Sequence, residues 1–315
     1  MNQFHFPIHP HTLRIDTARS FDVFSEGANG ELKLYQKSDE NYTAKDHAKI
    51  FKLNISKLYV KNSDRTRYFR YLETNYPSVL EDPLLNTPSK AEISHSLLIA
   101  MSITLFESPT EEFIARYKEC IRLLTEFTQK EENAIKYLIQ STASSHQLYN
   151  HVVNVGIFGM GLAKEILPPS SSHDMSQIAA GLFLHDIGRF TIPKYFNSRK
   201  GPLSNEEWEI MKKHPEEGYK LLKKNNALSD EITVIVWQHH ERHNGSGYPA
   251  GLIGNSIHTY SKICSISDTF DALTSHRPYR PAKTSFNALA VMQNEMKGEF
   301  DQKFFAQFVK LFSKQ

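Results

Sequence analysis

Residues 239–249 read HHERHNGSGYP, a run of metal-ligating side chains that leads into a glycine-containing loop. Apolar side chains precede the run at helical spacing, and those between 232 and 236 share one face with His239 and His240. Because the apolar face of a helix points into the core, both imidazoles are aimed inward. The stretch predicts a helical domain built around a buried polar centre.

Side chains of the same kind stand on apolar helical patterns elsewhere in the chain. His185 and Asp186 continue the helical face of Leu182. His214 precedes Pro215, and since proline suits the first helical turn, this histidine is expected at a helix junction. His151 and Asp268 stand on two further apolar helical patterns. The candidate metal ligands are therefore His151, His185, Asp186, His214, His239, His240 and Asp268.

A single histidine on an apolar face is more often a hydrogen-bonded core residue than a ligand. We keep that interpretation, or simple surface exposure, for His146, His173, His258 and His276. It fails for the candidate ligands taken together, because five imidazoles and two carboxylates aimed inward would leave many buried polar atoms unsatisfied. Metal coordination satisfies these polar atoms.

Nitrogen and carboxylate ligands without thiolate favour iron, manganese or a catalytic zinc, and this many ligands suit two bridged ions.

Five motifs, in this order and at these spacings, resemble the signatures of the HD-GYP family. They are HDIGR at 185–189, HP at 214–215, HHER at 239–242, GYP at 247–249 and RPYR at 277–280. The resemblance covers about residues 140–305 and implies a helical domain that hydrolyses the bacterial second messenger cyclic di-GMP. The expected fold is mainly α, with an HD-type helical bundle in residues 86–315 after a small α+β regulatory or dimerisation module in residues 1–80.

The resemblance also implies a role for each candidate ligand. It assigns His151, His185, Asp186 and Asp268 to one divalent ion and Asp186, His214, His239 and His240 to the other, with Asp186 as the bridge. Iron is the expected metal, with manganese or zinc as alternatives. The ions would activate water for in-line attack on phosphorus and stabilise the leaving 3′-oxygen. The product would be linear pGpG, which a second cleavage would convert to GMP.

The same resemblance implies residues for catalysis and substrate binding. Asp186 and Arg189 are expected to be catalytic. Tyr248 offers a ring for the face of a guanine base. The expected substrate contacts are Arg189, Tyr248, Arg280 and Lys283.

Three residues depart from the family pattern. Arg189 stands where lysine is usual, Asn244 replaces an aspartate, and Gln147 replaces a glutamate that can hold a third ion. A neutral amide is a poor ligand for a hard metal, so two ions are expected rather than three. The departures leave open a receptor that binds the nucleotide but turns it over slowly or not at all. A hydrolase of another phosphate ester is also left open.

Composition excludes several other classes of protein. A net charge of +2 argues against a broad nucleic-acid surface, so the expected partner is a small ligand, cyclic di-GMP. Cys120 and Cys264 are too few for a disulfide framework. No signal peptide is recognised, and the longest apolar stretch, 152–163, is too short to span a bilayer.

By resemblance we expect a bacterial cytoplasmic protein that contacts diguanylate cyclases or other signalling proteins through the GYP loop. A homodimer is left open.

The first part of the chain has a different organisation. Residues 21–24 and 31–35 flank Asn29-Gly30, which predicts a hairpin. A helix at 44–52, a strand at 57–60 and a helix at 65–74 are expected to follow. Prolines interrupt residues 75–90, and long helices are predicted at 91–106 and 110–141. The extended opening, 4–11, is not expected to bind metal because it lacks ligand partners.

Overall fold

The computed structural model describes residues 4–27, 29–53, 55–142, 148–168, 173–193, 195–198, 201, 203–225, 228–276 and 281–313. Among the residues singled out above, His146, Gln147 and Arg280 lie outside this part of the chain. The motif at 277–280 does so as a whole.

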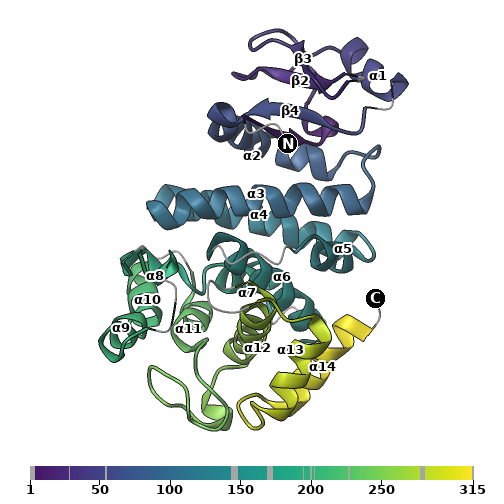
Figure 1. The fold of residues 1–315 in the computed structure, drawn as a ribbon. Coiled ribbons are helices and arrows are strands. Elements are labelled where there is room, and N and C mark those ends of the chain that lie inside the picture. Colours follow the sequence, from purple (N-terminus) through teal and green to yellow (C-terminus); the bar gives the residue numbers. More distant parts are fainter. Residues whose placement is uncertain are drawn as a thin grey trace. The chain divides into compact units, whose positions relative to one another are not determined.

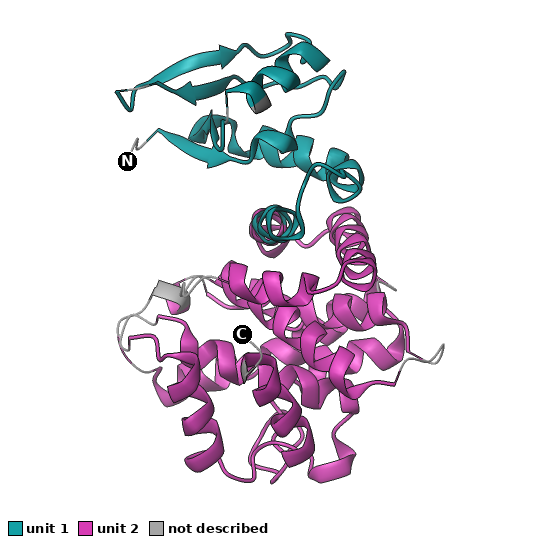
Figure 2. Cartoon of the chain, turned by 90° about the vertical axis from the view of Figure 1, so that its right-hand side faces the viewer, with its two compact units in different colours: residues 1–97 teal, residues 98–315 magenta. Residues whose placement is uncertain are grey.

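Two compact units make up the chain, residues 1–97 and 98–315 (Figure 2). The division falls inside one long helix, α3 (Thr87–Glu107). The domain ranges expected from the sequence, 1–80 and 86–315, concern independent folding units and stay a prediction.

The first unit contains a four-stranded antiparallel sheet in the order β1-β4-β2-β3. The predicted hairpin is present, with a bulge between Val23 and Phe24. Gly30 in its turn has a φ of 77°, a value that suits glycine. The opening segment forms an unpredicted strand at the sheet edge, where Pro7 is tolerated. The elements are β1 (His5–Ile8), β2 (Val23–Glu26), β3 (Leu32–Gln36), β4 (Leu58–Lys61), α1 (Ala44–Lys52), α2 (Arg65–Leu80) and the 3₁₀ helices η1 (Pro10–Thr12) and η2 (Asn62–Asp64).

Helix α2 runs six residues beyond the predicted end at residue 74 and includes Pro77. An internal proline removes a helical hydrogen bond. Tyr76 and Val79, on either side of it, are fully buried, and the Tyr76 hydroxyl donates to Ser94 Oγ at 2.7 Å. Burial of these side chains keeps the segment helical, so the prediction that the helix ends before Pro77 was wrong.

The second unit is helical, and the predicted fold class, a mainly α protein whose helical bundle follows a small α+β module, is confirmed. Helix α6 packs against α7, α12 and α14 (Figure 1). All its residues from 150 to 163 are buried. The helices are α4 (Glu111–Lys130), α5 (Ala134–Ser141), α6 (Leu148–Ile166), α7 (Met175–Phe183), α8 (Tyr195–Ser198), α9 (Asn205–Met211), α10 (His214–Lys224), α11 (Asp230–Gln238), α12 (Thr259–Thr274), α13 (Ser285–Asn294), α14 (Gln302–Ser313) and the 3₁₀ helices η3 (Ile187–Thr191) and η4 (Gly254–Ser256).

The helix predicted at 110–141 is two helices, α4 and α5. Asn133, between them, has a φ of 62° in the left-handed region, which breaks the helical path. In the described part of the chain, we find no helix with the length and apolar character that a membrane crossing requires.

Candidate metal centre

The ends of two helices place four of the candidate ligands. His185 and Asp186 lie in the turn between α7 and η3, and His239 and His240 directly follow α11, so these residues stand beyond the helices in which they were predicted. The Nδ1 atoms of His185 and His239 each donate to the carbonyl three residues earlier, at 2.8 Å. These bonds lie at the ends of the helices, and the Nε2 atoms of both rings face Asp186.

Two glycines bring the His185-Asp186 turn against the start of α10. A Cβ on Gly188 would overlap the backbone carbonyl of His214, and a Cβ on Gly218 would lie 2.9 Å from the backbone nitrogen of Gly188. Only glycine permits this approach. His214 begins α10 with Pro215 in its first turn, as predicted, and its Nε2 lies 3.0 Å from Asp186 Oδ1.

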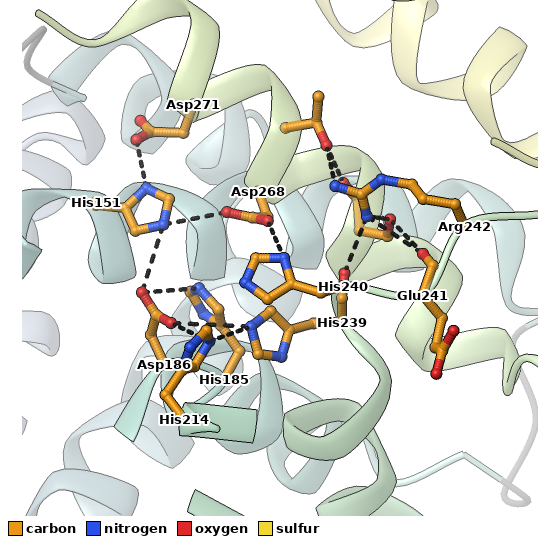
Figure 3. Close-up of polar contacts among 12 residues, drawn as sticks. His151, His185, Asp186, His214, His239, His240, Glu241, Arg242, Asp268 and Asp271 are labelled. Atoms are coloured by element: carbon orange, nitrogen blue, oxygen red, sulfur yellow. Dashed lines mark hydrogen bonds and ion pairs between the residues drawn. The ribbon is translucent and has the colours of Figure 1, made fainter. Parts of the chain in front are cut away.

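All seven candidate ligands meet in one cluster (Figure 3). Their ligand atoms form two groups, and within each group the atoms lie within 4.8 Å of one another. Every member is buried except His240, which is half-buried. The groups are Asp186, His214, His239 and His240, and His151, His185 and Asp268.

Both carboxylates of the cluster lie between the groups. Asp186 Oδ1 faces His214, whereas its Oδ2 lies 3.8 Å from the Nε2 of His151. Asp268 Oδ1 lies 3.2 Å from the same Nε2, and Asp268 Oδ2 lies 3.4 Å from His240 Nδ1. The geometry alone therefore permits either carboxylate to be shared.

The electrostatic surroundings suit divalent cations. Burial lowers the pKa of His239, and the neighbouring His185 and His214 lower it further, to about 3. Burial would raise the pKa of Asp186, but the charges of Arg189 and His214 lower it well below its ordinary value. Neutral imidazoles and ionised carboxylates are the forms that bind metal. The Nε2 of His185 is buried without a hydrogen-bond partner, as expected for an atom that coordinates an ion.

Asp271 is a candidate supporting residue of the metal centre that the sequence analysis missed. Its Oδ2 accepts from His151 Nδ1 at 2.7 Å, and its Oδ1 accepts from Asn154 Nδ2 at 2.8 Å. Although burial lowers the pKa of His151, the bonds to Asp268 and Asp271 raise it to about 9, because both carboxylates stabilise positive charge on the ring. The sequence offered part of the signal, because Asp271 lies one helical turn after Asp268 on α12, but it did not identify His151 as the partner.

Asp271→Asn is expected to lower metal affinity about 10–100-fold, because an outer carboxylate holds the orientation and basicity of the ligating imidazole. Equilibrium dialysis against Mn²⁺ followed by elemental analysis would measure it. Ser275→Ala is the matched control, since it removes only the 3.1 Å bond from Ser275 Oγ to the same carboxylate. Equal affinities for the wild type and Asp271→Asn would show that Asp271 does not support a ligand.

The glycine loop is held beside the cluster by Glu241. This buried carboxylate accepts from the backbone nitrogens of Ala250 at 2.7 Å and Leu252 at 2.9 Å. A Cβ on Gly247 would overlap the backbone at Glu241, so the loop needs glycine there. The Tyr248 ring stacks on His240, with centroids 4.7 Å apart. The loop thus adjoins the candidate metal centre.

The described substrate-contact candidates differ in their surroundings. Arg189 Nη1 lies 3.1 Å from Asp186 Oδ2, so its guanidinium is directly at the cluster. Lys283 is half-buried, and its backbone nitrogen donates to Leu273 O. Asn244 accepts from the backbone and the hydroxyl of Ser246, which closes the turn before the GYP motif.

Arg242, His173 and His258 have structural contacts. Arg242 donates to Ser265 Oγ at 2.7 Å and fixes the end of α11 to α12. His173 Nδ1 lies 2.8 Å from the Tyr260 hydroxyl, and His258 caps α12. Neither histidine belongs to the metal-ligating groups.

Comparisons with known proteins match this region. The HD domain family matches residues 138–304. A cyclic di-GMP phosphodiesterase response regulator, RpfG of Xanthomonas campestris, is 35% identical over 53% of this chain and 43% of its own length. The 3′3′-cGAMP-specific phosphodiesterase 2 of Vibrio cholerae is 33% identical over 51% of this chain and 31% of its own length. The chain thus spans less than half the length of each of these two relatives.

A solved structure resembles the chain along nearly its whole length. Bd1817, described as an HDG"Y"P protein from Bdellovibrio bacteriovorus, superposes with a TM-score of 0.69 over 98% of this chain and 99% of its own, at 20% identity. That likeness concerns the fold. Because the HD domain match covers more than half of the residues, the chain belongs to the HD domain family, and its motifs make it an HD-GYP member of that family.

Proposed function

We propose that this chain is a metal-dependent phosphodiesterase that hydrolyses cyclic di-GMP to linear pGpG, with GMP as the product of a second cleavage. The position of Asp186 supports this most directly, because its two oxygens face different groups of histidines. A carboxylate placed in this way is suited to bridge two ions. The similarity to a relative named for cyclic di-GMP hydrolysis supports the choice of substrate.

The donor set fits two divalent ions, with iron as the first candidate and manganese and zinc as alternatives. When bound, such ions polarise the phosphoryl group and activate water for in-line displacement. The chain's own residues prepare the centre. Backbone carbonyls hold the Nδ1 protons of His185 and His239, so that Nε2 is the ligating atom. The Arg189 guanidinium, whose side chain is 15% exposed, is paired with Asp186 at the cluster, which supports its proposed contact with a phosphate of the substrate.

A hydrolysis assay paired with metal analysis tests the proposal. Protein loaded separately with Fe²⁺, Mn²⁺ or Zn²⁺ is incubated with cyclic di-GMP or 3′3′-cGAMP, and products are separated by chromatography. We expect two ions per chain and pGpG as the first product. One ion or three at full occupancy would contradict the dinuclear centre. Faster cleavage of 3′3′-cGAMP would assign the chain to the other substrate named among its relatives.

One observation favours a second candidate, a cyclic di-GMP receptor with little turnover. The Arg189 guanidinium is paired with Asp186, the carboxylate expected to bridge the ions. A fixed positive charge at 3.1 Å competes for the electron density of that carboxylate. The same centre would then hold the nucleotide by its phosphates without efficient cleavage.

A further inference from the structure

Two aromatic rings form a corner beside the candidate metal centre, and we call Trp208 and Tyr248 the aromatic corner. Trp208 lies on α9 and Tyr248 in the glycine loop, with ring centroids 5.8 Å apart and planes at 78°. Tyr248 in turn stacks on His240 at 4.7 Å with an interplanar angle of 30°. A continuous path of rings leads from a candidate metal ligand to Trp208.

Exposure distinguishes the two rings of the corner. His240 covers one face of Tyr248, so this ring has at most one face left for a ligand. The Trp208 side chain is 44% exposed, although indole is among the largest apolar side chains. The described residues of α9 include no buried one, so Trp208 does not serve to anchor this helix in the core. Its indole is available as a stacking surface.

We propose that the aromatic corner binds one nucleobase of a cyclic dinucleotide, with the base stacked on the Trp208 indole and its edge against Tyr248. The inference rests on the proposed function and adds a base subsite to it. Phosphate groups of such a ligand belong at the metal centre, and its bases need flat apolar surfaces nearby. Stacking of a base on an aromatic side chain typically contributes more binding free energy than one peripheral contact does.

The chain's two tryptophans allow a direct test. The ring centroids of Trp237, on α11, and Tyr219 lie 6.4 Å apart. The substitution Trp237→Phe leaves Trp208 as the single source of tryptophan fluorescence. Stopped-flow mixing of this metal-loaded variant with cyclic di-GMP is expected to show saturable quenching of Trp208 emission before turnover. Trp208→Ala is expected to raise the apparent Kd and the KM about 5- to 150-fold, equivalent to ~1–3 kcal/mol per stacked base. Trp208→Phe should retain most of the affinity.

Trp237→Phe is the matched control for removal of an indole and should change KM by less than about twofold, because the Trp237 ring packs on Tyr219 rather than on Tyr248. Metal content is measured in every variant, because a stacking residue should leave it unchanged. Hydrolysis with no quenching, and with an unchanged KM in Trp208→Ala, would overturn the base subsite and leave the proposed function standing. A metal-loaded protein that neither binds nor cleaves a cyclic dinucleotide would overturn both.

Discussion

Asp186→Ala is expected to empty both metal positions and to lower phosphodiesterase activity more than about 100-fold. Loss of an outer partner of a ligand already costs about 10–100-fold in metal affinity or activity, and a shared ligand contributes to both ions. Without Asp186, the groups that Oδ1 and Oδ2 face would no longer be joined by this carboxylate, and two neighbouring cations would repel each other. Elemental analysis after gel filtration and a cyclic di-GMP hydrolysis assay would measure the two effects.

Asp268→Ala is the matched control, because Asp268 also lies between the two groups. If Asp186 is the bridge, Asp268→Ala should lose one ion and Asp186→Ala should lose two. The opposite pattern would assign the bridge to Asp268, and retention of both ions by Asp186→Ala would contradict our assignment. Circular dichroism of both variants would establish that the helices remain folded.

Helical periodicity predicted that most of the candidate ligands point into the core, and the resemblance then grouped them around two ions. His239 and His240 follow the end of α11, yet their spacing from its apolar residues correctly predicted that both imidazoles point inward, because that face of α11 is buried. The same reasoning identified His151 on α6 and Asp268 on α12, whose helices pack against each other. The apolar pattern predicts which side of a helix faces the core, because burial in the core is the physical cause of the pattern.

Periodicity could not predict where helices end or which second residues support the ligands. The Nδ1 bond of His185 to the carbonyl of Leu182 competes with the backbone at the end of α7, and such a bond depends on a side-chain rotamer. Pro77 was expected to end α2, yet Tyr76 and Val79 are buried on either side of it. The contact of Asp271 with His151 joins residues 120 positions apart in the sequence. A side-chain rotamer decides the first of these features, and tertiary packing decides the other two.

The surroundings of Arg189 separate the two candidate functions. Its Nη1 is 3.1 Å from Asp186 Oδ2, so the guanidinium touches the carboxylate that is proposed as the bridge. Lysine, the usual residue of the family here, carries a point charge, whereas the planar fork of arginine can pair with a carboxylate and a phosphate together. The substitution therefore changes geometry while it preserves the charge.

If the chain is an enzyme, Arg189→Ala is expected to lower kcat about 10²–10³-fold, as loss of one stabilising donor typically does, with a much smaller change in affinity. A receptor would instead lose affinity, by ~2–5 kcal/mol for a buried charge pair. Calorimetry with cyclic di-GMP and product analysis on the same metal-loaded samples would measure both quantities. Lys220→Ala is the control for loss of a positive charge, because this lysine is 57% exposed and paired with Glu216.

Metal content decides how a loss in Arg189→Ala is interpreted. A variant that keeps both ions but loses turnover acts on the transition state, since stabilisation made only there appears in kcat. A variant that loses an ion acts through Asp186, which the guanidinium would then serve to orient. Wild-type protein that carries both ions and does not bind cyclic di-GMP at micromolar concentrations would exclude the enzyme and the receptor alike. The centre would then belong to a hydrolase of a different phosphate ester, because the ligand cluster does not depend on the identity of the nucleotide.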